Sequence, residues 1–131
     1  MTISHLYVRY LLIGKEHIHL MVEYQGKKYN CPMELVVHLI SGKWKAVILW
    51  NLSNGSQRFG ELISKFPNLT EKVLTAQLRA LEKDGLVVRT VYPEVPLRVE
   101  YSLSVMGETL IPILKEINTW GHGFRDMTSI L

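Results

Sequence analysis

Three side chains in the middle of the chain, Lys72, Thr75 and Arg79, have types and a spacing that suit contact with a nucleic acid. On a helix of about 3.6 residues per turn they lie within about 100° of one another, together with Glu71 and Glu82. Arginine can donate two parallel hydrogen bonds to a base, threonine can donate, accept or contact a methyl group, and lysine can neutralise phosphate. A solvated helix face, in which Arg79 pairs with Glu82 or Glu71, explains the same stripe, and the stripe alone favours it.

Four further cations lie where they could reach the same surface. Arg98 follows the string "PEVPL", which cannot continue a strand and therefore predicts a stiff hairpin tip. At such a tip Arg98 would face a nucleic-acid backbone or a narrow minor groove. Arg58, Lys43 and Lys45 lie at expected helix starts and could hold phosphates, although each is as easily an ordinary surface charge.

Composition excludes several other classes of protein. A chain of 131 residues, 47% hydrophobic and 21% charged, has the size of one globular domain with a real core. A formal charge of +3 favours an anionic partner only mildly. No run reaches the roughly 18 apolar residues of a membrane span, and no secretory leader is recognisable. We therefore expect a soluble, cytoplasmic protein that does not enter a membrane.

No motif for catalysis or metal binding is present in the sequence. There is no phosphate-binding glycine loop, catalytic triad or pair of acids at catalytic spacing. One cysteine and five scattered histidines provide no zinc-ligand spacing. The sequence therefore predicts a protein that is not an enzyme and that has no metal site and no cofactor.

The sequence also contains helix start and stop signals, which place Lys72, Thr75 and Arg79 on one helix. We call these three residues the cation stripe. In "CPMELVVHLI" Pro32 suits a first helical position, and Gly42 ends that helix. "KWKAVILWNL" predicts a second, largely buried helix, and after a short strand-like "QRF" the string "GELISKF" predicts a third that Pro67 ends. A fourth begins at Thr70, whose hydroxyl can cap it, and ends at Gly85, which tolerates a left-handed conformation.

Strand signals flank this group of helices. After the fourth helix, "LVVRTVY" and "RVEYSL" alternate side chains as two strands of a hairpin, with "PEVPL" as the tip. Near the N-terminus, "LYVRYLLI" and "HIHLMVEY" could be two strands about a glycine-containing turn, or part of a poorly ordered leader ahead of an internal start at Met21. Helix, turn, helix and hairpin in this order predict an α+β, mainly helical fold: a winged helix-turn-helix in which the fourth helix enters a major groove.

The C-terminal segment predicts a dimerisation helix. Its apolar residues recur at alternating steps of three and four, which is a heptad-like seam. The seam consists of Leu103, Met106, Leu110, Ile113, Ile117, Trp120 and Phe124. We expect the last five of these to form the dimer interface, with Pro112 bending the helix; packing against the same chain's core is the alternative.

Three separated strings resemble the HxlR-type, MarR-like winged-helix transcriptional regulators: "CPMELVVHLISGKW", "RFGELISKFPNLTEKVLTAQLRALEKDGLVVR" and "YPEVPLRVEYSLSVMGETLIPIL". The resemblance covers the chain from about Tyr29 to Gly121. Ser41, Asn68 and Leu97 depart from the family's usual glycine, glycine and proline, which affects loop stiffness more than the fold. The resemblance implies residues 1–28 as an N-terminal extension, either a leader or a β-arm, and residues 29–131 as the winged domain with its dimer helix.

By this resemblance the protein is a homodimer that binds near-palindromic, double-stranded operator DNA, usually as a repressor. Lys72, Thr75 and Arg79 then act on the recognition helix and Arg98 on the wing. A two-fold dimer places its recognition helices about 34 Å apart, one turn of DNA. The alternative is a winged-helix module that binds another protein and not DNA.

Cys31 is the only cysteine of the chain. Some regulators of this family sense oxidants or electrophiles through a cysteine in the same "CP" position. Backbone N–H groups and the helix dipole at an expected helix start favour the thiolate, whereas burial would oppose it. We therefore expect either a redox sensor or a buried thiol, and any disulfide must join a second copy or a small thiol. The effector would be an oxidant or another small molecule.

Overall fold

The computed structural model describes residues 7–13 and 17–128, with side chains for residues 21–125 and 127. The chain forms two compact units, Met1–Gly42 and Lys43–Leu131, and each is described by itself. The predicted domain boundary after residue 28 falls inside the first unit. That the winged domain begins at residue 29 stays a prediction.

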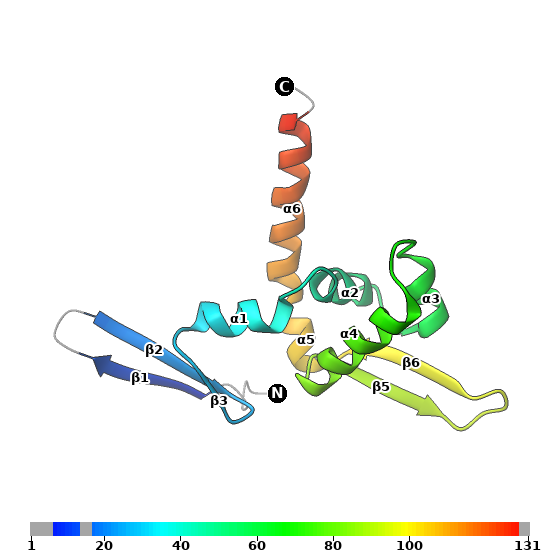
Figure 1. Ribbon diagram of the computed structural model, residues 1–131, viewed down its shortest axis with the longest axis horizontal. Helices are drawn as coiled ribbons and strands as arrows, with labels where there is room; N and C mark the ends of the chain where they lie inside the picture. Colours follow the sequence, from blue (N-terminus) through cyan, green and yellow to red (C-terminus); the bar gives the residue numbers. More distant parts are fainter. Residues whose placement is uncertain (1–6, 14–16, 129–131) are drawn as a thin grey trace. The chain divides into compact units, whose positions relative to one another are not determined.

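The first unit is a three-stranded antiparallel sheet followed by one helix (Figure 1). Its elements are β1 (Tyr7–Ile13), β2 (His17–Tyr24), β3 (Lys27–Tyr29) and α1 (Pro32–Ile40). The structure thus has the two strands that the N-terminal pattern indicated, and adds β3, which lies beside β2 after a turn at Gln25 and Gly26. Leu35 and Leu39 of α1 are buried.

The second unit contains the remaining helices and a second sheet. Its elements are α2 (Lys45–Leu52), β4 (Gln57–Arg58), α3 (Phe59–Ser64), α4 (Glu71–Lys83), β5 (Val87–Tyr92), β6 (Arg98–Leu103), α5 (Val105–Thr109) and α6 (Ile111–Thr128). The sheet is antiparallel with strand order β4-β6-β5, so β5 and β6 form the predicted hairpin and β4 joins the edge of β6. This arrangement confirms the predicted winged helix-turn-helix.

Apolar residues at helical spacing form the core of the second unit. α2, α3 and α4 all contribute to it, and so does the start of the wing. The side chains that are almost fully enclosed are Ile48, Leu49, Leu52, Leu62, Leu74, Leu78, Leu81 and Leu86. Burial of a leucine or isoleucine contributes about 1.5–3 kcal/mol relative to exposure, so this cluster fixes the helices against the sheet.

A short joint connects the wing to the C-terminal helix. The Ser104 hydroxyl caps α5 by accepting a hydrogen bond from the Gly107 N–H (3.0 Å), and it donates one to the Gly85 carbonyl oxygen (2.6 Å). Gly107 is buried, and a Cβ added there would overlap the carbonyl oxygen of Leu86. The joint therefore requires glycine for close packing, and it ties the end of α4 to the start of α5.

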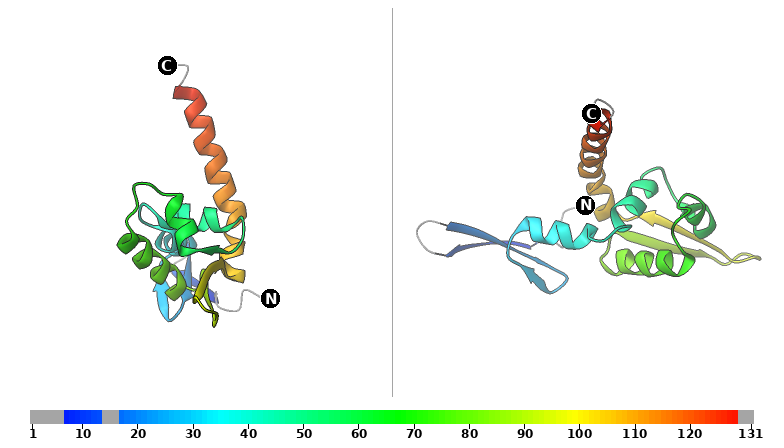
Figure 2. Two further views of the ribbon diagram at one scale, coloured as in Figure 1. Left: turned by 90° about the vertical axis from the view of Figure 1, so that its right-hand side faces the viewer. Right: turned by 45° about the horizontal axis from the view of Figure 1, so that its top comes forward.

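α6 extends away from the rest of the second unit, as the views in Figures 1 and 2 agree. The expected single helix is instead broken at Leu110, so Pro112 lies in the first turn of α6 and does not bend its middle. This placement is physically reasonable because a proline in the first turn removes no helical hydrogen bond. Leu110 and Leu114 are buried at the base of α6, which packs on α2. Among the described residues, no helix has both the length and the apolar character needed to cross a membrane.

Candidate nucleic-acid interface

The helix α4, predicted to be the recognition helix, is well defined at both ends. Thr70 accepts a hydrogen bond from the Val73 N–H at 3.2 Å, as its position predicted. Gly85 ends the helix with a φ of 78°, a left-handed conformation that glycine adopts without steric cost. Leu74, Leu78 and Leu81 hold one face of α4 in the core, so the remaining face is rigidly presented.

The cations of the stripe on α4 are not paired with the neighbouring acids. Such pairing, of Arg79 with Glu71 or Glu82, was the simpler explanation of the stripe. Lys72 and Arg79 are exposed, and within the described part of the chain neither makes an ion pair. Thr75 is half-buried, and its hydroxyl donates to the Glu71 carbonyl oxygen at 2.8 Å. Thr75 therefore keeps its methyl group and acceptor lone pairs for a partner, while its proton is already used.

The wing contributes a cation that the sequence analysis did not single out. Arg89 of β5 lies directly opposite Tyr101 of β6, so both side chains are on one face of the hairpin. Together with Thr75, Arg79 and Glu82 of α4 they line a hollow of about 360 Å³, which we call the helix–wing hollow. Arg89 shares this face with the buried Val87, and that two-residue alternation is the signal that could have identified it.

Arg98 lies on the other face of the same hairpin. It pairs in register with Tyr92, and its guanidinium lies 3.7 Å from the centre of that ring. Nη2 and Nη1 donate to carboxylate oxygens of Glu94 (3.0 Å) and Glu100 (2.9 Å). Partial burial opposes the charged form, but the two carboxylates outweigh it and raise the pKa of Arg98 above its ordinary value. The structure thus shows Arg98 bracing the wing, and contact with DNA would require it to leave its partners.

The three cations at helix starts, Arg58, Lys43 and Lys45, differ in how accessible they are to a phosphate. Arg58 is exposed at the start of α3, and its backbone N–H donates to the Glu61 carboxylate at 3.4 Å. Lys43 is exposed and lies over the Trp44 ring, with Nζ 5.0 Å from the ring centre. Lys45 is mostly covered, and its Nζ is 3.9 Å from a carboxylate oxygen of Asp84 at the end of α4. Arg58 and Lys43 can therefore reach a phosphate more readily than Lys45.

Cys31 is exposed in the first unit, immediately before α1. Its side chain makes no capping hydrogen bond to the helix. The alternative of a buried, inert thiol is therefore wrong, and the sulfur is accessible to an oxidant or electrophile.

The far part of α6 presents an uncovered apolar stripe. Ile113, Ile117, Trp120 and Phe124 are each about half exposed or more, and Met127 extends the stripe beyond the predicted residues. The Trp120 and Phe124 rings already stack, with centres 6.0 Å apart. Leu110 differs, because it is buried within its own chain. For this residue the alternative prediction, packing against the same chain's core, is the correct one. The other four predicted interface residues remain available to a partner.

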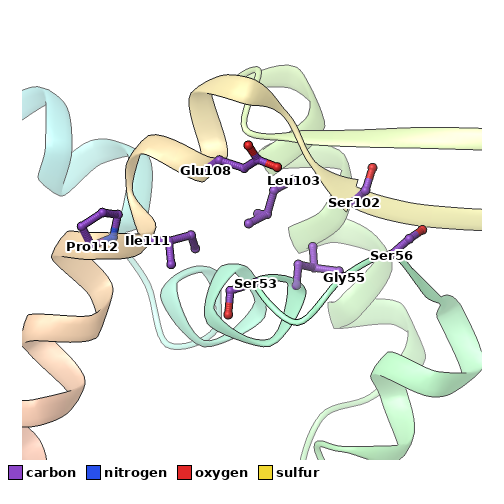
Figure 3. A pocket seen from close by; sticks show the side chains of 9 residues that line it. Ser53, Gly55, Ser56, Ser102, Leu103, Glu108, Ile111 and Pro112 are labelled. Atoms are coloured by element: carbon purple, nitrogen blue, oxygen red, sulfur yellow. The ribbon is translucent and has the colours of Figure 1, made fainter.

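A second concavity, of about 460 Å³, lies at the base of α6 (Figure 3). Serine hydroxyls and one carboxylate surround an otherwise apolar surface. Its lining residues are Leu52, Ser53, Gly55, Ser56, Ser102, Leu103, Glu108, Ile111 and Pro112. Within the described residues, no group of three His, Cys, Asp or Glu side chains could hold a metal ion.

Comparison with known proteins identifies the family. A family model described as HxlR-like helix-turn-helix matches residues 39–129. The HTH-type transcriptional regulator YtcD of Bacillus subtilis is 50% identical over 97 residues, which are 74% of this chain and 77% of YtcD.

Solved structures give the same result. The redox regulator HypR in its reduced form is 42% identical with a TM-score of 0.71, over 76% of this chain and 99% of that one. The reduced form of the transcriptional regulator YodB from B. subtilis is 34% identical with a TM-score of 0.65, over 72% of this chain and 93% of that one. The chain therefore belongs to the HxlR-like helix-turn-helix family, and it is a DNA-binding transcriptional regulator, not an enzyme.

Proposed function

We propose that this protein binds a near-palindromic operator as a homodimer and represses transcription of nearby genes. The observation that carries the proposal is the uncommitted cation stripe of α4, held rigidly by the leucine face and flanked by the wing. Arg79 reads a base by two parallel hydrogen bonds, Thr75 contributes its methyl group and oxygen lone pairs, and Lys72 neutralises phosphate.

The remaining cations have supporting roles in this proposal. Arg58 and Lys43 hold backbone phosphates beside the groove, and Lys45 contributes mainly through its ion pair with Asp84, which connects α2 to the end of α4. Arg98 keeps the wing in shape and reaches DNA only if it exchanges a carboxylate for a phosphate. Residues 1–28 act as an N-terminal extension to the winged domain of residues 29–131.

The dimer forms through α6. Ile113, Ile117, Trp120 and Phe124 lie on one side of the helix at steps of three and four, which suits pairing with a second copy of the same helix. Every residue from Lys115 to Arg125 is exposed, so a monomer would leave this apolar stripe in water. A two-fold pair of such helices supports an operator with two related half-sites.

Cys31 makes the regulator responsive to oxidants or electrophiles. The support is its exposure before α1 and the likeness to two solved structures, the redox regulator HypR and the reduced form of YodB. Two Cys31 thiols from two copies would lose two protons and two electrons to an oxidant such as diamide, forming one disulfide. A small-molecule effector would instead find room in the concavity at the base of α6.

Selection of host genomic fragments by the purified dimer, followed by a salt titration, tests the DNA proposal. We expect enrichment of a near-palindromic sequence and a log affinity that falls linearly with log salt, by about 0.9 per neutralised phosphate. Absence of enrichment together with no salt-dependent binding would favour the protein-binding module. For the sensor role, diamide should release operator DNA from the wild type and not from Cys31→Ser; equal release from both would reject it.

A further inference from the structure

The helix–wing hollow is lined by two arginines from separate elements. Arg79 comes from α4, and Arg89 comes from β5 on the sheet face that carries Tyr101. The elements are fixed by buried neighbours, Leu78 before Arg79 and Val87 two residues before Arg89. Their proximity is therefore built into the fold and does not depend on mobile segments.

The charges in the hollow are not balanced by ion pairs. Glu82 is its only acid, and within the described residues neither Arg79 nor Arg89 has a carboxylate within ion-pair distance. The Tyr101 hydroxyl likewise has no hydrogen-bond partner among the described residues. Two arginines beside a free hydroxyl and one acid leave a net positive site with unused donors, which suits one anionic group with several acceptor oxygens.

We propose that the hollow binds one phosphodiester group of the DNA backbone, with Arg89 as its main cation and the Tyr101 hydroxyl as a second donor. This inference rests on the proposed function, because it assigns a partner to the surface beside the recognition helix. The hollow's volume of about 360 Å³ exceeds the roughly 30 Å³ that one water occupies, so it can hold a phosphate with bridging waters. Arg79 remains free to reach a base.

The bound phosphate fixes the position of α4 in the groove. Contacts to phosphate set the register of a protein on DNA, whereas contacts to base edges read sequence. Because Arg89 and Arg79 share one hollow, the phosphate held by Arg89 belongs to a nucleotide next to the base that Arg79 reads. Arg89 is thus a positioning residue. It makes the phosphate contact that was predicted for Arg98, whose guanidinium lies on the opposite face and is already bound to two carboxylates.

Arg89→Gln removes the cation with little effect on folding, since Arg89 is exposed and its side chain makes no ion pair or hydrogen bond with the described residues. The salt slope should fall by about 0.9 per subunit, or about 1.8 per dimer, which corresponds to up to about 60-fold weaker binding at 0.1 M salt. Lys115→Gln, which removes one charge from the exposed side of α6, is the matched control and should leave both values unchanged. An unchanged slope for Arg89→Gln would overturn the proposal.

Operator duplexes with a single neutral methylphosphonate linkage distinguish one bound phosphate from a general loss of charge. At one position per half-site the neutral linkage should weaken the wild type and have no effect on Arg89→Gln. Equal effects on both proteins at every position would refute a specific phosphate site.

The acid in the hollow provides an independent measurement. Glu82→Gln should tighten binding and strengthen the effect of that linkage, whereas Glu23→Gln on β2, outside both the hollow and the α6 stripe, should do neither. If the wild type failed to bind DNA at all, the proposed function itself would fail; if it bound normally and only these effects were missing, this inference alone would.

Discussion

Replacement of Trp120 by alanine should weaken the proposed dimer without unfolding the subunit. Trp120 is 75% exposed in the chain by itself. An enclosed aromatic side chain buries about 150–250 Å², so pairing could cover about 110–190 Å² more of each Trp120. At about 25 cal/mol per Å² this is about 3–5 kcal/mol per subunit before the costs of association and of ordering side chains. We expect at least about 2 kcal/mol to remain per dimer, a roughly 30-fold larger dissociation constant.

Sedimentation at several concentrations measures that constant directly. Asn118→Ala is the matched control, because Asn118 is also exposed on α6 but lies away from the apolar stripe. Far-ultraviolet circular dichroism should show the same helix content for both variants, since Trp120 contributes nothing to the chain's buried core. A dissociation constant that is unchanged by Trp120→Ala, with the wild type dimeric, would refute the assignment of this stripe to the interface.

Four other changes have defined outcomes. Arg79→Ala should cost about 1–3 kcal/mol on the operator and flatten the preference at one base position, measured against random DNA; equal loss on both duplexes would remove it from base reading. Arg98→Ala should leave the salt slope nearly unchanged while making the hairpin more sensitive to proteolysis; a slope reduced by about one per subunit would instead support the predicted phosphate contact. Gly107→Ala should lower the free energy of unfolding by about 1–3 kcal/mol in denaturant titrations, because the added methyl group overlaps the Leu86 carbonyl oxygen. Gly121→Ala, on the exposed part of α6, should leave that free energy unchanged or raise it by up to about 1 kcal/mol. Cys31→Ser should keep operator affinity and lose its response to diamide, read by electrophoretic mobility shift.

Local chemistry allowed the order of elements in the second unit to be predicted. A threonine before an amphipathic run and a glycine after it define α4, and proline-rich residues between two alternating runs define the hairpin. These signals depend only on neighbouring residues, so a single sequence contains them. β3 was not predicted because three residues give too short an alternation to recognise.

The site was harder to predict because it depends on which face of a strand each residue takes. Arg98 and Arg89 both look like wing cations in the sequence, but pairing places Arg98 beside Tyr92 and Arg89 beside Tyr101, on opposite faces. The distinction follows from the register, and a shift of one residue would exchange the two faces. The acids that hold Arg98 also had no special signal, since Glu94 and Glu100 are ordinary surface residues until the hairpin closes around them.

The joint at Ser104 makes the two proposed activities, DNA reading and dimerisation, mechanically dependent. The hydroxyl group bonds to the end of α4 through the Gly85 carbonyl oxygen and to the start of α5 through the Gly107 N–H. The Ser104 N–H also donates to the Leu86 carbonyl oxygen at 3.0 Å, and Leu86 is fully buried. Because packed interiors transmit displacement and do not absorb it, a change in the angle of α5, which leads into α6, must either move α4 or break these bonds. In the proposed dimer, the angle between α4 and α6 therefore depends on the contacts where Gly85, Ser104 and Gly107 meet, together with the break at Leu110 and the packing of α6 on α2.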